Sequence, residues 1–164
     1  MIYWVFSILI AVFAYFMGNL NSVVVASNFV FHTNLQRLGK GNAAFSNFRR
    51  LFGIKGGLKL LLVELLIDLL PILIGGWLFG IKDHAIVGRA FAGFCLVMGR
   101  VYPALYELKG GHGITALIVA AFCVNFSVGA AVLFFVLAVI WFSRYLSLAA
   151  LTGAVTLIIA ALLL

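Results

Sequence analysis

The longest polar stretch of the chain, residues 32–59, has the composition of a phosphate-binding segment. It holds six basic residues, no acidic residue and five glycines in an otherwise apolar sequence. Glycines let backbone N–H groups converge on phosphate oxygens, and basic side chains beside an apolar segment attract phosphate headgroups. Arginine can grip the same oxygens with two parallel hydrogen bonds. The residues best placed for this binding are Gly39, Lys40, Gly41, Asn42, Arg49 and Arg50. The alternative is a basic loop that only fixes membrane orientation.

A second glycine-rich basic turn, KGGHG, occupies residues 109–113. Lys109, Gly110, Gly111 and Gly113 repeat the chemistry of the first stretch. His112 adds an imidazole, a group suited to general-base catalysis or to hydrogen bonding with phosphate near neutral pH. We expect the two stretches to form one site for a phosphate-headed ligand.

Two acidic residues, Glu64 and Asp68, lie one turn apart inside an apolar segment. A carboxylate inside an apolar membrane segment must be neutral, paired or beside a wet cavity, which makes it a candidate for function. The alternative is a structural pair with Arg89, with Arg100 or with a polar residue of the first helix.

The composition requires elements that lie in a membrane. Hydrophobic residues make up 66% of the chain and charged residues 9%, and the mean hydropathy is +1.26, which excludes an ordinary soluble globule. Long unbroken apolar runs indicate an all-α polytopic membrane protein. Basic residues occur in short loops, so nucleic acid is not an expected partner. Cys95 and Cys123 lie in apolar segments, and no metal or cofactor site is expected.

We expect about six membrane-spanning helices in a single domain, residues 1–164. A polar interruption at 18–22 breaks the first helix or is buried against protein, and Pro71 kinks the second or changes its direction. The thirty-residue apolar run 114–143 is too long for one helix, so two short helices that turn near Asn125 are expected; one helix there would give five. The other expected helices are 2–30, 57–80, 85–107 and 145–164.

Charge indicates how these helices are oriented. The positive-inside rule places the stretch 32–59, Lys109 and Arg144 on the inner face if there are six helices. The loop 82–84 and the turn near Asn125 then lie outside, as do both termini. The N-terminal run lacks a basic start and a cleavage site, so we expect a retained helix rather than a signal peptide.

Four stretches together resemble motifs of the bacterial acyl-phosphate:glycerol-3-phosphate acyltransferases, the PlsY family. Residues 39–53, GKGNAAFSNFRRLFG, match the motif G-S-G-N-x-G-A-T-N-x-x-R-x-x-G, with Asn47 and Arg50 in register. Residues 99–116, GRVYPALYELKGGHGITA, match G-H-x-x-P-x-F-x-x-F-K-G-G-K-G-V-A-T. Residues 144–148, RYLSL, match R-Y-V-S-L, and residues 18–21 match a G-S-I-P patch in the first helix.

The resemblance implies an integral membrane enzyme of the bacterial cytoplasmic membrane, with its main basic loops cytoplasmic. Such an enzyme transfers a fatty acyl group from acyl phosphate to glycerol 3-phosphate and gives lysophosphatidic acid, without a metal or cofactor. By resemblance, Asn42 and Arg50 in the first loop and Lys109 with its glycines in the second bind the phosphates, and Ser147 stands near the site. Membrane lipids and a membrane-protein partner or a second copy are the other expected partners.

This sequence also departs from the family pattern. Lys40 stands where the family has serine, Ser46 where it has threonine, and Ile67 where it has lysine. Arg100 replaces a histidine and His112 replaces a lysine. The candidate catalytic residues are Lys40 and His112, which replace family residues, and Ser147, which matches the family motif. Family members continue to a third basic motif, H-R-x-N-x-x-R-L, which is not expected here because the sequence ends at Leu164.

Three functions stay open on the sequence. The first is a divergent acyltransferase with the family's substrates or a related acceptor. The second is a catalytically inactive relative that binds lipid or acts as an assembly subunit of a membrane complex. The third is a small transporter or channel that uses Glu64 and Asp68.

Overall fold

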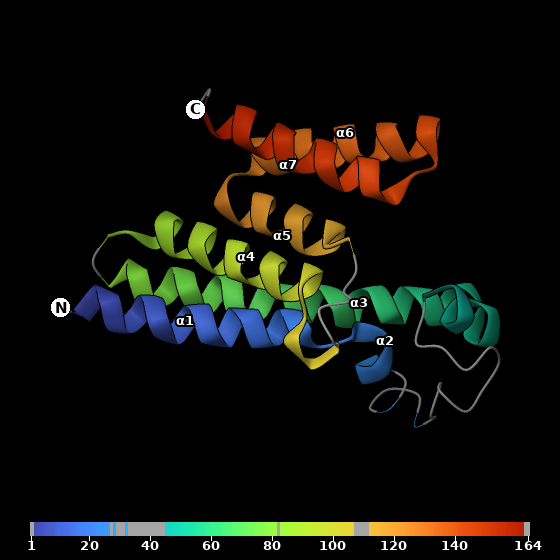
Figure 1. The fold of residues 1–164 in the computed structure, drawn as a ribbon, viewed down its shortest axis with the longest axis horizontal. Coiled ribbons are helices and arrows are strands. Elements are labelled where there is room, and N and C mark those ends of the chain that lie inside the picture. The colour runs from blue at the N-terminus through green and yellow to red at the C-terminus, as the bar shows by residue number, and fades with distance from the viewer. Residues whose placement is uncertain are drawn as a thin grey trace. The chain divides into compact units, whose positions relative to one another are not determined.

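The computed structural model describes residues 2–26, 28, 32, 45–81, 83–106 and 112–162. These residues form helices joined by short connections, and no strand occurs among them (Figure 1). The chain divides into two compact units, and each is described by itself. Unit 1 contains Met1–Asn19 and Asp68–Leu164, and unit 2 contains Leu20–Ile67. The predicted all-α class is confirmed, whereas a single domain over 1–164 stays a prediction.

Unit 1 is a helix bundle in which α1 packs on α4, α4 on α5, α5 on α6, and α6 on α7 (Figure 1). The first pair, α1 and α4, is parallel, and the later pairs are antiparallel. The elements of unit 1 are α1 (Ile2–Asn19), the part of α3 (Phe45–Gly80) from Asp68 onward, α4 (Ala85–Val101), the 3-10 helix η3 (Ala104–Tyr106), α5 (Ile114–Val124), α6 (Phe126–Ser143) and α7 (Leu146–Leu162).

Unit 2 contains α2 (Ser22–Val25) and the part of α3 up to Ile67. Its core is small. Val23, Ala26 and Leu60 are buried together, and Phe52 and Val63 pack against them.

Asparagines end two of the predicted helices where the sequence placed a break. The first helix stops at Asn19, and the Asn21 side chain accepts a hydrogen bond from the backbone N–H of Val23 (3.0 Å), which caps α2. Asn125 adopts an extended conformation between α5 and α6 and accepts from the N–H of Ser127 (2.8 Å). The expected division of 114–143 into two helices is therefore confirmed.

Two expected boundaries are wrong. Residues 45–56, expected in a polar loop before a helix at 57–80, lie in α3, because Phe45, Phe48 and Phe52 recur at helical spacing despite the glycines and basic residues around them. The backbone at Pro71 is helical, and the kink or change of direction expected there stays a prediction; among the described residues of α3, the non-helical one is Gly53 (φ 66°, ψ −165°). The third helix ends at Val101 rather than 107, because a proline at 103 disfavours helical backbone before it.

Glycines let the helices of unit 1 approach closely, as is common between helices in membranes. A Cβ built on Gly99 of α4 would overlap the backbone of Tyr15 in α1, and one on Gly18 would overlap the backbone at Leu96. Gly75 of α3 and Gly88 of α4 meet in the same way. The core behind these crossings includes Ile10, Ala14, Ile72, Ala92 and Leu96, each no more than 1% exposed.

Within the described residues, one helix, α6, is long and apolar enough to cross a membrane by itself. Shorter apolar helices cover 4–19, 114–124 and 146–160. Large apolar side chains of α6 point outward, among them Phe134 (68% exposed), Trp141 (82%) and Phe142 (86%), as expected of a surface solvated by lipid. The predicted count of six spans stays a prediction.

The Gly99 crossing gives a stability prediction. Gly99→Ala should lower the free energy of unfolding by about 1–3 kcal/mol, because the added methyl group forces α1 and α4 apart. Gly80→Ala is the matched control, since its Cβ would lie an ordinary 3.5 Å from that of Ala85. Reversible unfolding in mixed detergent micelles measures both variants. Equal stability of the two variants would contradict the close crossing.

Candidate functional site

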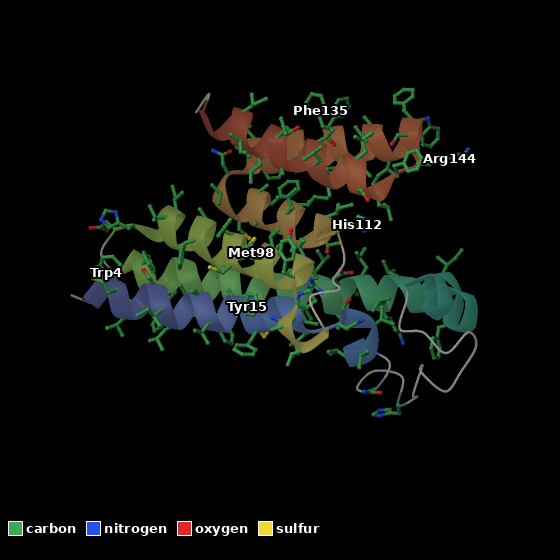
Figure 2. All side chains as sticks on the ribbon, in the orientation of Figure 1. Trp4, Tyr15, Met98, His112, Phe135 and Arg144 are labelled. Atoms are coloured by element: carbon green, nitrogen blue, oxygen red, sulfur yellow. The ribbon has the colours of Figure 1, made fainter. Side chains whose placement is uncertain are left out.

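The predicted site residues that the structure describes in unit 1 lie toward one end of that unit. Figure 1 shows the C-terminal ends of α1 and α4 and the N-terminal ends of α5 and α7 on this side. In Figure 2, His112 and Arg144 lie there, away from Trp4 at the start of α1. The predicted placement of Lys109 and Arg144 on one face of the membrane stays a prediction, because Lys109 lies outside the described residues.

His112 and Ser147, two of the three candidate catalytic residues, touch each other. The His112 Nε2 and Ser147 Oγ atoms are 3.0 Å apart, and both side chains are exposed. His112 comes just before Gly113, whose left-handed backbone (φ 66°) starts α5, and Ser147 is in the first turn of α7. The contact joins a hydroxyl, which can act as a nucleophile, to an imidazole, which can act as a base. Catalytic roles for the two residues stay predictions.

Asp68 forms an ion pair with Arg100. The carboxylate Oδ1 of Asp68 accepts a hydrogen bond from Nη2 of Arg100, and the two side chains are 0% and 11% exposed. The sequence left open whether Asp68 is functional or forms a structural pair, and its bond to Arg100 supports a structural pair between helices. Arg89, the other proposed partner, instead donates from Nη1 to the carbonyl oxygen of Cys123 (3.1 Å), in the last turn of α5. Carbonyls there have no intrahelical donor, so a cation is favourable.

A buried amide ties the end of α1 to η3. The Asn19 side chain, 2% exposed, donates to the carbonyl of Tyr15 (2.7 Å) and accepts from the N–H of Leu105 (3.3 Å). The Tyr15 hydroxyl donates to the carbonyl of Tyr102 (2.8 Å). These bonds hold the segment that follows α4 against α1.

Sequence reasoning placed Asn19 in the polar interruption at 18–22 but gave its amide no partner, and it gave Tyr15 and Tyr102 no role. The available signal was Asn19 itself, a polar residue next to Gly18 at the end of an apolar helix. Its partner, the N–H of Leu105, is a backbone group, and no side-chain pattern marks such a group.

Several predicted binding residues lie outside the described part of the chain: Gly39, Lys40, Gly41, Asn42, Lys109, Gly110 and Gly111. Asn47 and Arg50 belong to the backbone of α3, in its segment before Gly53, rather than to a loop. Glu64 is half-buried in unit 2. The predicted union of the two glycine-rich stretches in one site therefore stays a prediction.

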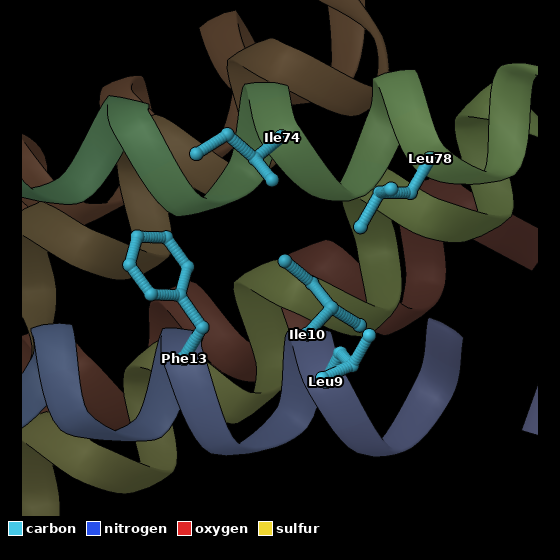
Figure 3. A pocket seen from close by; sticks show the side chains of 5 residues that line it. All are labelled: Leu9, Ile10, Phe13, Ile74 and Leu78. Atoms are coloured by element: carbon cyan, nitrogen blue, oxygen red, sulfur yellow. The ribbon is translucent and has the colours of Figure 1, made fainter. Parts of the chain in front are cut away.

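An apolar groove of about 250 Å³ lies between α1 and α3 in unit 1. Figure 3 shows its lining, which consists of Leu9, Ile10, Phe13, Ile74 and Leu78. Because no lining residue is polar, this groove offers nothing to bind a phosphate. Among the described residues, no group of three His, Cys, Asp or Glu side chains is arranged to hold a metal ion.

Comparison with known proteins finds one family over nearly the whole chain. Residues 8–164 match the family model described as glycerol-3-phosphate acyltransferase. The glycerol-3-phosphate acyltransferase of Thermoanaerobacter sp. (strain X514) is 27% identical over 154 residues, which cover 94% of this chain and 75% of that protein. That of Aquifex aeolicus (strain VF5) is 28% identical over 150 residues, covering 92% and 76%.

The fold is also similar to a solved structure. The crystal structure of PlsY, an integral membrane glycerol 3-phosphate acyltransferase, in its glycerol 3-phosphate form matches with a TM-score of 0.68 and 25% sequence identity. The match covers 96% of this chain and 76% of the PlsY chain. The lysophosphatidic acid form matches with a TM-score of 0.70 and 24% identity, over the same shares of the two chains.

The Asp68–Arg100 pair should be a major source of stability only while both partners are present. Asp68→Ala should lower the free energy of unfolding by about 3–5 kcal/mol, because the Arg100 cation then stays buried without this carboxylate. The double variant Asp68→Leu/Arg100→Met should lose much less than the two single variants together. The control is Asp83→Asn, which removes an exposed acid where asparagine tolerates the positive φ (61°). Denaturant unfolding measures the free energies. If the double variant lost as much as the two single variants together, the ion pair would be contradicted.

Proposed function

The chain belongs to the glycerol-3-phosphate acyltransferase family, and we propose that it transfers a fatty acyl group from acyl phosphate to glycerol 3-phosphate or a closely related acceptor. The product with glycerol 3-phosphate is lysophosphatidic acid, and the reaction takes place in a membrane as a step of phospholipid biosynthesis. The observation that carries the proposal is the fold match to the glycerol 3-phosphate form of PlsY over 96% of this chain.

The proposed phosphate ligands are the two glycine-rich stretches. Arg50 and Asn42, with Gly39, Gly41 and Asn47, bind one phosphate group, and Lys109 with Gly110, Gly111 and Gly113 binds the other. Lys40 adds a further cation where the family has a serine. Charge-assisted hydrogen bonds of this kind hold a phosphate in one orientation, and arginine does so through two parallel bonds.

The proposed reacting centre lies beside His112 and Ser147. Acyl phosphate is already activated, because phosphate is a good leaving group. The protein therefore contributes mainly by holding the acceptor hydroxyl against the acyl carbonyl carbon and by stabilising the negative charge that develops on the carbonyl oxygen. The 3.0 Å contact between the imidazole and the hydroxyl supports this placement, because it puts a proton acceptor and a hydroxyl together near the second glycine-rich turn.

The proposed setting is the bacterial cytoplasmic membrane, with residues 32–59 and 109–113 at the cytoplasmic face. Basic residues concentrate in these stretches and at Arg144, which supports that orientation. A membrane-protein partner or a second copy of the chain belongs to the proposal as well.

Of the alternatives, transport through Asp68 has the least support. Asp68 is fully buried and bonded to Arg100, so it is not presented to a wet pathway. A catalytically inactive relative differs from the proposal in one measurable respect. It would bind the phosphate-bearing ligand without consuming acyl phosphate.

Turnover tests the proposal directly. The purified chain in a lipid mesophase should convert palmitoyl phosphate and glycerol 3-phosphate into lysophosphatidic acid and inorganic phosphate. Arg50→Ala should lower kcat/KM about 10- to 100-fold, because a charge-assisted phosphate contact is lost. Lys55→Ala is the control, since Lys55 is an exposed cation of α3 after Gly53 and is not one of the proposed ligands. Absence of product from folded protein would overturn the proposal.

Ligand binding then separates the proposal from the inactive alternative. Arg50→Ala and Lys109→Ala should each weaken binding of glycerol 3-phosphate or of a non-hydrolysable acyl phosphonate by about 1.5–3 kcal/mol. Isothermal titration calorimetry measures the loss. Unchanged binding in both variants would rule out a site shared by the two stretches. Normal binding by the wild type without turnover would favour the inactive relative.

A further inference from the structure

Arg89 is a cation that the proposed reaction does not use. It is in the second turn of α4, so it lies about 6 Å along the helix axis from Ala85. In Figure 1 this end of α4 lies at the same end of unit 1 as the start of α1, and Figure 2 shows His112 away from that end. Arg89 is therefore separate from the groups proposed to bind the substrates.

The Arg89 side chain runs through a slot that a glycine opens. Gly76 of α3 is buried, and a Cβ built on it would come 2.7 Å from Cγ and 2.9 Å from Nε of Arg89. Beyond the slot, Nη1 of Arg89 donates to the carbonyl oxygen of Cys123 in α5 (3.1 Å). Residues of α3, α4 and α5 thus hold the guanidinium in one orientation.

The guanidinium keeps most of its hydrogen-bond donors available. Its N–H groups form a planar fork, and the bond to Cys123 uses one of them. In the described part of the chain, Nε is buried without a hydrogen-bond partner, and Arg89 forms no ion pair with an acidic side chain. The side chain as a whole is partly exposed. A cation held in place without a carboxylate is complementary to an external anion.

The surface around the start of α4 is apolar. Trp77, next to Gly76, and Phe126, at the start of α6, are large and exposed, as is Val87, two positions before Arg89. Tryptophan is enriched where the hydrocarbon of a membrane meets the headgroups. An arginine near the end of a helix places its charged group at that level while its stem stays among apolar side chains. This setting suits a ligand that has both an anionic group and apolar chains.

We infer that Arg89 binds the phosphate of a phospholipid in the membrane leaflet at this end of unit 1. A guanidinium and a phosphate group match in geometry and form two parallel hydrogen bonds. The exposed apolar side chains nearby contact the acyl chains, which a free phosphate ion lacks. The lipid neutralises a cation that joins three helices, and so it stabilises unit 1. This site does not depend on the proposed reaction.

Native mass spectrometry of the full chain, together with thermal unfolding, tests this site. The delipidated protein in neutral detergent is titrated separately with phosphatidylglycerol, with diacylglycerol of the same acyl chains and with inorganic phosphate. We expect phosphatidylglycerol to stay bound after the detergent is removed and to raise the melting temperature. Diacylglycerol should do neither, and inorganic phosphate should give no stabilisation that depends on Arg89.

Two variants distinguish a built site from general attraction of anionic lipid. Arg89→Gln should lower retention of phosphatidylglycerol by about 10-fold, because the charge-assisted bonds to phosphate are lost. Gly76→Ala keeps the charge but displaces the flexible Arg89 side chain, so it should lower retention to a similar extent. Gly80→Ala, one turn later on α3, is the matched control and should bind like the wild type, because its Cβ would lie an ordinary 3.5 Å from that of Ala85.

Wild-type retention of phosphatidylglycerol by Arg89→Gln would overturn the site, even if that variant melted at a lower temperature, because Arg89 would then serve only the end of α5. Wild-type retention by Gly76→Ala would overturn the built slot. Equal retention of diacylglycerol, or equal Arg89-dependent stabilisation by inorganic phosphate, would overturn a phospholipid as the ligand. Arg50→Ala should keep the lipid, since Arg50 belongs to the proposed substrate site; loss of the lipid in that variant would contradict a separate site.

Discussion

The buried ion pair between Asp68 and Arg100 is the constraint on which the arrangement of unit 1 depends. An uncompensated charge in an apolar interior costs several kcal/mol, so α3 and α4 must pack in the register that brings these two side chains together. Gly99 precedes Arg100 and lets the backbone of α1 come close at the same level. The end of α1 is thereby placed so that the Asn19 amide reaches the N–H of Leu105.

These contacts explain how a chain with so little polar sequence can position a chemical site. The charge is neutralised inside the bundle, where Asp68 contributes stability, and the groups suited to chemistry lie toward the end of unit 1. There His112 precedes α5 and Ser147 starts α7, and their contact joins the two helices without any acidic partner among the described side chains bonded to the imidazole. Small residues at the crossings keep this packing close, while the large apolar side chains of α6 face outward.

The sequence predicted those features that depend on length and local chemistry. Thirty apolar residues exceed one membrane thickness, and Asn125 supplied the break; the polar patch at 18–22 ended α1 in the same way. It did not predict the start of α3, because glycines and basic residues from 45 to 59 obscured the helical spacing of the phenylalanines. The contacts of Asn19 and the pairing of His112 with Ser147 join positions far apart in the chain, so no local pattern could reveal them.

Photo-crosslinking can show whether acyl phosphate binds at the end of unit 1 where His112 and Ser147 meet, as we propose. A palmitoyl phosphonate that carries a diazirine beside its headgroup would be irradiated with the full chain in a lipid mesophase, and the labelled peptides identified by mass spectrometry. We expect label in peptides that contain His112 or Ser147, and we expect excess acyl phosphate to reduce it. Label confined to peptides from the opposite end of unit 1, such as those with Trp4 or His84, would contradict the proposal.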